Sequence, residues 1–475
     1  MKKIQGIEVA INTLKWAAKT VPAYREFLKK NNFQIKNIKT VDDFSAVPLM
    51  DKDNYIKAYP YLDLFPLGKV PSVISSSSGS SGTPFYWPRG REQEIAGGNL
   101  HEPIFRDIFK IGKKRTLVVN CFSAGTWIAG AFTTESCRHL AETKGYNISV
   151  IPPGIEKEDI LSILKRLAPL FDVVVIAGYP PFLMDVVTEA SSRDIPLKNM
   201  NIKFIFAGEN FSEKWRQVIC DIAFIEDIEH SVASVYGTAD AAMLGHETPL
   251  SIFIRQKANK NKAFFKEFFG DLTFLPTLVQ YQPDHIYFEN INNEIVFTVK
   301  GGIPLVRYNI RDRGRIFSHT EIRAILKKYK YDKEIAHELK KWEMPFVSLH
   351  GRNDVSVTFY ALNMFPENFK YGLEDTRISE YVTGKFVVSS KTTSDQKTQE
   401  LHLSIELSPN IHKKTIPIAV IEKIIVERLR NSNTEYRKLH DTLGKKAIPK
   451  IKLLPYSDPV FILKKIKHSW IKKEI

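Results

Sequence analysis

The chain has 475 residues, of which 43% are hydrophobic and 25% charged, as in an ordinary globular protein of about two to four domains. No apolar run reaches the roughly eighteen residues of a transmembrane helix, so we expect no membrane span. Glu8, Asn12 and Lys15 interrupt the stretch in which a signal peptide would be apolar, so we expect a mature start. The three cysteines lack the short paired spacings of zinc sites and disulfide frameworks, which favours a reducing cytoplasm.

Positive charge is in excess and unevenly distributed. Lys and Arg number 68 against 53 Asp and Glu, which gives a net charge of +15. The segment from Ile411 to the end holds sixteen Lys and Arg against six Asp and Glu, and so carries ten of the fifteen excess charges. This charge favours anionic partners: a nucleotide, coenzyme A, an acidic carrier protein, nucleic acid or a membrane surface.

Residues 1–70 have the pattern of helices and turns. An amphipathic stretch covers 7–18, Pro22 stands at the start of a second helix, and the segment after Thr40 predicts a capped turn. We expect this region to form a lid or brace.

The segment Ser75–Pro84 consists almost entirely of small hydroxyl residues and glycine. Such a composition is typical of a flexible linker. It also suits a loop whose backbone N–H groups and hydroxyls surround a phosphate. Val70–Ile74 before it predicts a buried strand and Phe85–Trp87 after it an aromatic anchor, and these apolar flanks favour the phosphate loop. No Gly-Lys-Ser/Thr follows at the spacing of a Walker A loop.

Strands and helices alternate after this segment. A helical pattern runs over 91–110, and four short apolar strands follow with helix-length segments between them. The alternation predicts a mainly parallel sheet covered by helices on both faces, with ligands at the carboxyl ends of the strands. The strands are Thr116–Phe122, Ile148–Ile151, Val173–Ala177 and Ile202–Phe206, and polar or glycine-containing turns follow three of them at 123–125, 178–181 and 208–210.

The rest of the chain predicts a β-rich subdomain and then a separate small domain. Residues 251–299 have the pattern of strands, beginning with Ser251–Ile254, and Asn290–Asn293 predicts a hairpin turn. A charged stretch over 319–342 predicts a solvated helix or a paired insertion. We therefore expect an α/β fold with a large N-terminal domain over 1–350 and a small, mobile α+β domain over 351–475, with strands near 355–359, 385–389, 401–406 and 450–454 and a helix near 416–429.

Three further motifs carry groups that suit nucleotide chemistry. In 236–240, the Tyr236 ring offers a surface for adenine, and Asp240 can hold Mg²⁺ beside phosphate oxygens; a helix N-cap aspartate is the alternative. Asp312, which lies among four arginines, can accept both hydroxyls of a ribose or belong to a surface ion-pair cluster. Residues 351–354, Gly-Arg-Asn-Asp, stand where the composition changes and would be a hinge if the two halves move.

Taken in this order, these segments resemble the motifs of the adenylate-forming (acyl-CoA synthetase) superfamily and, within it, most closely the phenylacetate-CoA ligase family. Residues 77–84 resemble that family's Ser-Ser-Gly-Thr-Thr-Gly-Lys-Pro phosphate loop, and 236–240 its Tyr-Gly-x-x-Glu motif. Residues 307–312 resemble Arg-Tyr-x-Thr-Gly-Asp, and 351–354 Gly-Arg-x-Asp. The resemblance covers nearly the whole chain, with supporting matches at 22–25, 48–52, 207–209, 284–289 and 365–368.

The resemblance implies ATP-dependent activation of a carboxylic acid, of aryl or small acyl type, to an acyl-adenylate, followed by transfer to a thiol, coenzyme A. It implies that Asp240 binds Mg²⁺ and serves catalysis, that Asp312 and Arg352 hold the ribose, and that the small domain swivels at Asp354. The further nucleotide-binding residues that it implies are Ser77, Ser78, Gly79, Ser80, Ser81, Gly82, Thr83, Gly208, Glu209, Tyr236, Gly237 and Thr238.

The sequence departs from the family's pattern at several points. Thr83 replaces the loop lysine and removes a cation, Asp240 replaces a glutamate, and 310–311 replace the usual Thr-Gly. The family's C-terminal catalytic lysine follows a glycine that is absent here. Lys465 is the first candidate for that role and Lys467 the second, with a basic surface strand as the alternative.

The acyl group is expected where the turns converge, although aromatic residues there equally suit the core. Two rival functions remain: an adenylating enzyme that transfers the acyl group to a carrier protein or another acceptor, and a non-catalytic protein that binds a nucleotide or nucleic acid. Nucleic acid is the less favoured partner. The sequence does not determine the oligomeric state, and it is compatible with a homodimer. The candidates for the acyl pocket are Trp127, Ile128, Phe206, Ala207 and Tyr236.

Overall fold

The computed structural model describes most of the chain, and several predicted site residues lie outside the described part. The described residues are 6–36, 38–76, 85–123, 125–126, 128–270, 272, 274–352, 357–360, 362–364, 366–392, 399–413 and 415–461. The predicted residues outside them are Ser77, Ser78, Gly79, Ser80, Ser81, Gly82, Thr83, Trp127, Asp354, Lys465 and Lys467.

The chain forms two compact units. The first comprises Met1–Phe264 and Thr277–His350, and the second comprises Phe265–Pro276 and Gly351–Ile475. Among the helices of the described ranges, none combines the length and apolar character needed to cross a bilayer.

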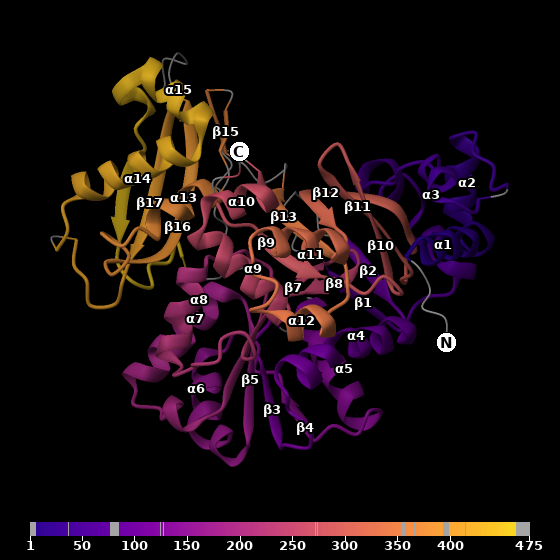
Figure 1. The fold of residues 1–475 in the computed structure, drawn as a ribbon, viewed down its shortest axis with the longest axis horizontal. Coiled ribbons are helices and arrows are strands. Elements are labelled where there is room, and N and C mark those ends of the chain that lie inside the picture. Colours follow the sequence, from indigo (N-terminus) through magenta and orange to yellow (C-terminus); the bar gives the residue numbers. More distant parts are fainter. Residues whose placement is uncertain are drawn as a thin grey trace. The chain divides into compact units, whose positions relative to one another are not determined.

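An eleven-stranded sheet organises the first unit (Figure 1), in the strand order β10-β11-β12-β13-β9-β8-β7-β6-β5-β3-β4. Neighbours among β3 to β7 pair in parallel, whereas β8 runs antiparallel to β7. The strands are β3 (Thr116–Asn120), β4 (Ile148–Ile151), β5 (Val173–Gly178), β6 (Ile202–Ala207), β7 (Val232–Thr238), β8 (Ala242–His246), β9 (Thr277–Gln280), β10 (Ile286–Ile291), β11 (Glu294–Val299), β12 (Leu305–Phe317) and β13 (Phe346–Arg352).

Helices follow most of the parallel strands, as the alternating pattern predicts. Every residue of β3 and of β5 is buried, because a parallel sheet is covered on both faces. The mixed α/β fold is thus confirmed. The helices of this part of the chain are α4 (Arg91–Pro103), α5 (Ile128–Glu142), α6 (Lys157–Arg166), α7 (Pro180–Ser192), α8 (Glu213–Ile222), α9 (Pro249–Lys260), α10 (Lys262–Phe269), α11 (His319–Lys328) and α12 (Ala336–Lys341).

The N-terminal region packs against the antiparallel end of this sheet. Helices α1 (Gly6–Thr20) and α2 (Pro22–Lys30) share one apolar core with β10 to β12, and α2 begins at the predicted Pro22. The predicted cap before α3 (Val41–Ser45) is also present, since the Thr40 hydroxyl accepts from the backbone N–H of Asp43. This region therefore braces the strands that carry Tyr308 and Asp312.

Two local predictions were wrong. Ser251–Ile254 is not a strand but part of α9, which begins with Pro249 after a Thr248 cap that accepts from the backbone N–H of Ser251. The strand before the Ser/Gly segment is β1 (Val73–Ser76), and its burial is the reverse of that expected. Its valine and isoleucine are exposed, whereas Ser75 and Ser76 are buried, since β1 pairs with β2 (Tyr86–Arg89) and turns its serine end inward.

The second unit is a small α+β structure with its own apolar core. Strand β17 pairs antiparallel with β16 and parallel with β18, and the strands predicted near 385–389, 401–406 and 450–454 are confirmed. Its elements are β14 (Val357–Phe359), β15 (Leu362–Met364), α13 (Pro366–Leu373), β16 (Val382–Thr392), β17 (Gln399–Leu407), α14 (Ile418–Ser432), α15 (Thr434–Leu443) and β18 (Lys450–Leu454).

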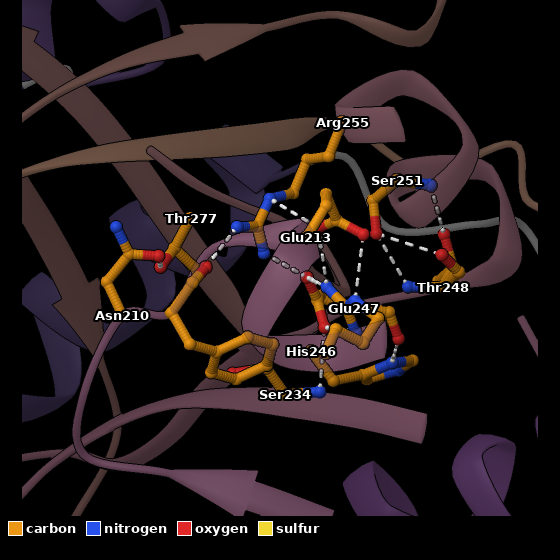
Figure 2. A network of polar contacts seen from close by, with 11 residues as sticks. Asn210, Glu213, Ser234, His246, Glu247, Thr248, Ser251, Arg255 and Thr277 are labelled. Atoms are coloured by element: carbon orange, nitrogen blue, oxygen red, sulfur yellow. Dashed lines mark hydrogen bonds and ion pairs between the residues drawn. The ribbon is translucent and has the colours of Figure 1, made fainter. Parts of the chain in front are cut away.

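A buried ion network lies beneath the central strands of the first unit (Figure 2). Glu247, which follows β8, accepts from Arg216 at 2.7 Å and from Arg255 at 2.7 Å, and its other oxygen accepts from the backbone N–H of Ser234 on β7. Glu213 adds a second carboxylate, bonded to Arg216 at 3.0 Å. Burial alone would raise the pKa of Glu247, but the two guanidiniums hold it below its ordinary value.

Breaking this network is expected to destabilise the fold strongly. Glu247→Gln keeps the side-chain volume but leaves two buried guanidiniums short of a countercharge, so the free energy of unfolding should fall by about 3–5 kcal/mol. Glu158→Gln is the matched control, because Glu158 also pairs with an arginine but its side chain is 73% exposed. Urea unfolding followed by tryptophan fluorescence measures both, and equal midpoints for the two variants would contradict the role of the network.

Candidate functional site

The carboxyl ends of β3, β5, β6 and β7 are neighbours along one edge of the sheet. After β3, the backbone N–H of Cys121 donates to the carbonyl of Ala177 on β5, and the Phe122 ring meets the Tyr179 ring edge to face at 5.4 Å. Gly178 at the end of β5 pairs with Phe206 of β6, and burial and then the charge of Glu209 raise the pKa of Tyr179. The three turns predicted as ligand-binding therefore lie together.

The Ser/Gly segment is attached at this same edge. In the β1–β2 ladder, Val73 pairs with Arg89 at one end and Ser76 pairs with Tyr86 at the other. The segment 77–84 follows Ser76 in the sequence and returns to β2 just before Tyr86. The backbone N–H of Ser76 donates to the carbonyl of Thr126 at 2.6 Å, in the turn that follows β3. Ser76 and its partner Tyr86, the flanking strand residues, are thus held beside the turn that follows β3.

Two tyrosine–aspartate pairs join β7 to β12. The Tyr236 hydroxyl donates to Asp312 Oδ2 at 2.6 Å, and the Tyr308 hydroxyl donates to Asp240 Oδ2 at 2.7 Å. Tyr236 and Asp312 are 8% and 7% exposed, Tyr308 is 1% exposed and Asp240 is half-buried. We call these four residues the tyrosine–aspartate clasp, and each strand contributes one tyrosine to it.

The clasp requires a curved sheet. Three strands, β13, β9 and β8, separate β12 from β7 in the strand order. In a flat sheet the two strands would lie roughly 19 Å apart, too far for a tyrosine and an aspartate to meet. Gly314 on β12 shows how closely the strands approach, since a Cβ atom there would lie 2.2 Å from the carbonyl oxygen of Ser348 on β13.

For two of these carboxylates the structure excludes the non-functional alternative. Asp240 does not cap a helix, because it lies in the turn between β7 and β8. Asp312 is not part of a surface ion cluster, since it is buried and accepts from Tyr236. The neighbouring arginines form the ion pairs instead, Arg311 with Asp51 and Asp53, and Arg307 with Glu289.

The predicted turn with Gly208 and Glu209 is held by the ion network and by β9 (Figure 2). Gly208 has a φ of +94°, which favours glycine. Arg255 of the ion network donates to the carbonyl of Phe211 at 2.6 Å, and the Thr277 hydroxyl donates to Asn210 Oδ1 at 2.9 Å. The network thereby fixes a turn at the candidate site.

The acyl-pocket candidates fall in different environments. Phe206 is fully buried and packs against Phe204, Phe211 and Trp215, as the core alternative predicts. Ala207 is half-buried at the end of β6, and Ile128 begins α5 after the turn that follows β3.

The remaining described candidates lie on β13 and at the end of β7. Arg352 ends β13. Gly237 is exposed near the end of β7. The Thr238 hydroxyl accepts from the backbone N–H of Ala241 at 3.0 Å, within the turn between β7 and β8. Within the described ranges, no three His, Cys, Asp or Glu side chains form a group that could hold a metal ion.

Sequence reasoning missed Arg89, the last residue of β2. It is 3% exposed, and its Nη2 donates to the carbonyl of Ala239, the residue before Asp240. Burial lowers its pKa to about 9, while the charge of Asp240 acts in the opposite direction. A signal was available in the sequence, since Arg89 is the first basic residue after Lys69 and follows the Ser/Gly segment by five positions.

The fold is shared with known ligases. The structure of 2-hydroxyisobutyryl-CoA ligase in the postadenylation state with 2-HIB-AMP matches with a TM-score of 0.69 and 15% identity, covering 98% of this chain and 89% of that one. An acyl acid amido synthetase in complex with 2,4-DB matches with a TM-score of 0.58 and 15% identity, covering 96% and 87%. No protein-family model matches the sequence, and no curated protein sequence does. The comparisons show that this chain shares the fold of these enzymes, which consists of a large and a small domain.

The clasp is expected to contribute measurably to stability. In a double-mutant cycle with Tyr236→Phe and Asp312→Asn, the coupling energy should be about 1–3 kcal/mol, because a buried carboxylate loses a charge-assisted hydrogen bond. Tyr146→Phe with Glu102→Gln is the matched cycle, since this tyrosine also donates to a carboxylate, at 3.0 Å, but nearer the surface. Urea unfolding gives both values, and a clasp coupling no larger than that of the control pair would show that the contact is incidental.

Proposed function

We propose that this protein is an ATP-dependent ligase that activates a carboxylic acid as an acyl-adenylate and transfers the acyl group to coenzyme A. The acid's oxygen attacks the α-phosphorus of ATP, pyrophosphate leaves, and the thiol sulfur then displaces AMP from the acyl carbon. The observation that carries the proposal is the clasp, which gathers Tyr236, Asp240 and Asp312 at the carboxyl ends of parallel strands.

The clasp residues suit this role chemically. Asp312 is held in place by Tyr236 and is a fixed acceptor for ribose hydroxyls. Asp240 is held by Tyr308, and Mg²⁺ is commonly bound by one or two carboxylates together with substrate phosphates, so Asp240 is the residue that would hold it. The two hydroxyls therefore orient two carboxylates before a nucleotide binds, which reduces the ordering that binding requires.

The finer assignment rests on the sequence motifs. We propose a phenylacetate-CoA ligase-like enzyme whose Ser77–Thr83 loop surrounds the phosphates, whose acid is of aryl or small acyl type, and whose small domain, from 351 onward, swivels at Asp354 between the two half-reactions. Asp240 and Asp312, fixed by hydrogen bonds, position the nucleotide. Thr83 stands where the family has a lysine, so the loop itself carries no cation.

A panel of aryl and alkyl carboxylic acids tests the proposal. At least one acid should release pyrophosphate from ATP in the presence of Mg²⁺, and the same acid should form a thioester when coenzyme A is added. Pyrophosphate release that needs no coenzyme A, with no thioester formed, would favour another acceptor. Silence from every acid, with salt-sensitive binding of nucleic acid, would overturn the ligase assignment.

The C-terminal lysines make a second test. Lys465→Ala should slow acid-dependent pyrophosphate release roughly 10²- to 10³-fold, because a donor placed on the developing charge is lost. Lys467→Ala is the paired variant and should slow it less. Pyrophosphate release is followed by a coupled assay under saturating ATP, and full activity in both variants would remove both lysines from the mechanism.

A further inference from the structure

Arg89 is a buried cation whose hydrogen-bonding capacity is largely unused. Its Nη2 donates to the carbonyl of Ala239. In the described part of the chain, Nε and Nη1 have no hydrogen-bond partner although the residue is 97% buried. Burying unpaired N–H groups of a guanidinium is costly, so such an arrangement points to an anionic ligand.

The backbone around Arg89 is fixed on several sides. Arg89 pairs with Val73 in the β1–β2 ladder. A Cβ atom at Gly302 would lie 2.2 Å from the carbonyl oxygen of Pro88, so the loop before β12 presses directly on β2. The guanidinium is therefore held at a set position beside the turn of Asp240, and the charge of Asp240 acts on it.

The position of Arg89 in the sequence links it to the Ser/Gly segment. Between Lys69 and Arg89 the sequence has neither a basic nor an acidic residue. The segment can offer backbone N–H groups and hydroxyls to an anion, but no positive charge of its own. Arg89 ends the short strand that follows the segment, and Ser76, which precedes the segment, pairs with Tyr86 of that strand.

We propose that Arg89 binds the phosphate chain of the nucleotide beside the turn of Asp240. The inference rests on the proposed function and goes beyond it, because it names the residue that makes the chain bind ATP and pyrophosphate more tightly than it would without a cation there, while leaving AMP binding nearly unchanged. Nη2 fixes the guanidinium to the turn of Asp240, and Nε and Nη1 donate to phosphate oxygens. A planar guanidinium is well matched to such oxygens.

Binding measurements on the full chain test this inference. Isothermal titration calorimetry gives dissociation constants for ATP, inorganic pyrophosphate and AMP, with Mg²⁺ present. Arg89→Met should weaken ATP and pyrophosphate about 10- to 100-fold and AMP less than about threefold, since the β- and γ-phosphates lose a cation. Arg89→Lys keeps the charge without the planar fork and should fall between wild type and Arg89→Met, and it serves if the methionine variant does not fold.

Arg91→Met is the matched control, because this exposed arginine lies two residues further on at the start of α4. It should bind all three ligands as the wild type does. A folded Arg89 variant that binds ATP normally would overturn the inference. An equal loss of affinity for AMP and ATP would also overturn it, because Arg89 would then only hold the turn of Asp240 in place. A wild-type chain that binds neither ATP nor pyrophosphate would instead refute the proposed function, and this inference with it.

Discussion

The hydrogen bonds of the tyrosine–aspartate clasp are the constraint on which the candidate site depends. They join strands that three others separate in the sheet order, so they exist only because the sheet curves. Curvature of this kind needs close backbone approach, which Gly314 permits between β12 and β13. The result is that carboxylates from two distant segments face the same edge at which the parallel strands end.

The surroundings of the clasp explain why it can stay rigid. Glu247 ties β7 to α8 and α9 through Arg216 and Arg255, and Arg255 also holds the turn after β6 (Figure 2). Beside it, the N-terminal region adds a strand-like contact, since the backbone of Met50 exchanges hydrogen bonds with Arg307 and Asn309 on either side of Tyr308. Buried polar groups that are mutually satisfied rigidify a structure, which suits a site that must position reactants.

The sequence predicts the local elements well and the long-range contacts poorly. β18 has the predicted bounds, Pro22 begins α2, and Thr40 supplies the predicted cap, before a short helix rather than a turn, because these signals lie within a few residues. The strand prediction for Ser251–Ile254 is wrong because a serine followed by three apolar residues suits a buried helix as well as a strand, and Thr248-Pro249 is a helix start signal. Tyr236, Asp240 and Asp312, which the motifs predict as site residues, lie in the clasp, but their pairing partners depend on long-range sheet geometry, which no local pattern encodes. The position of Arg89 after the uncharged stretch 70–88 is a sequence signal, but the burial that singles this arginine out is visible only in the structure.

The most direct test of the account is a crystal structure of the full chain with a non-hydrolysable ATP analogue and Mg²⁺. The account predicts a nucleotide at the carboxyl ends of β3, β5, β6 and β7, with its ribose hydroxyls at hydrogen-bond distance from Asp312 and its phosphate chain beside Asp240. A nucleotide bound elsewhere on the chain, or a clasp whose tyrosines and aspartates lie apart, would contradict it.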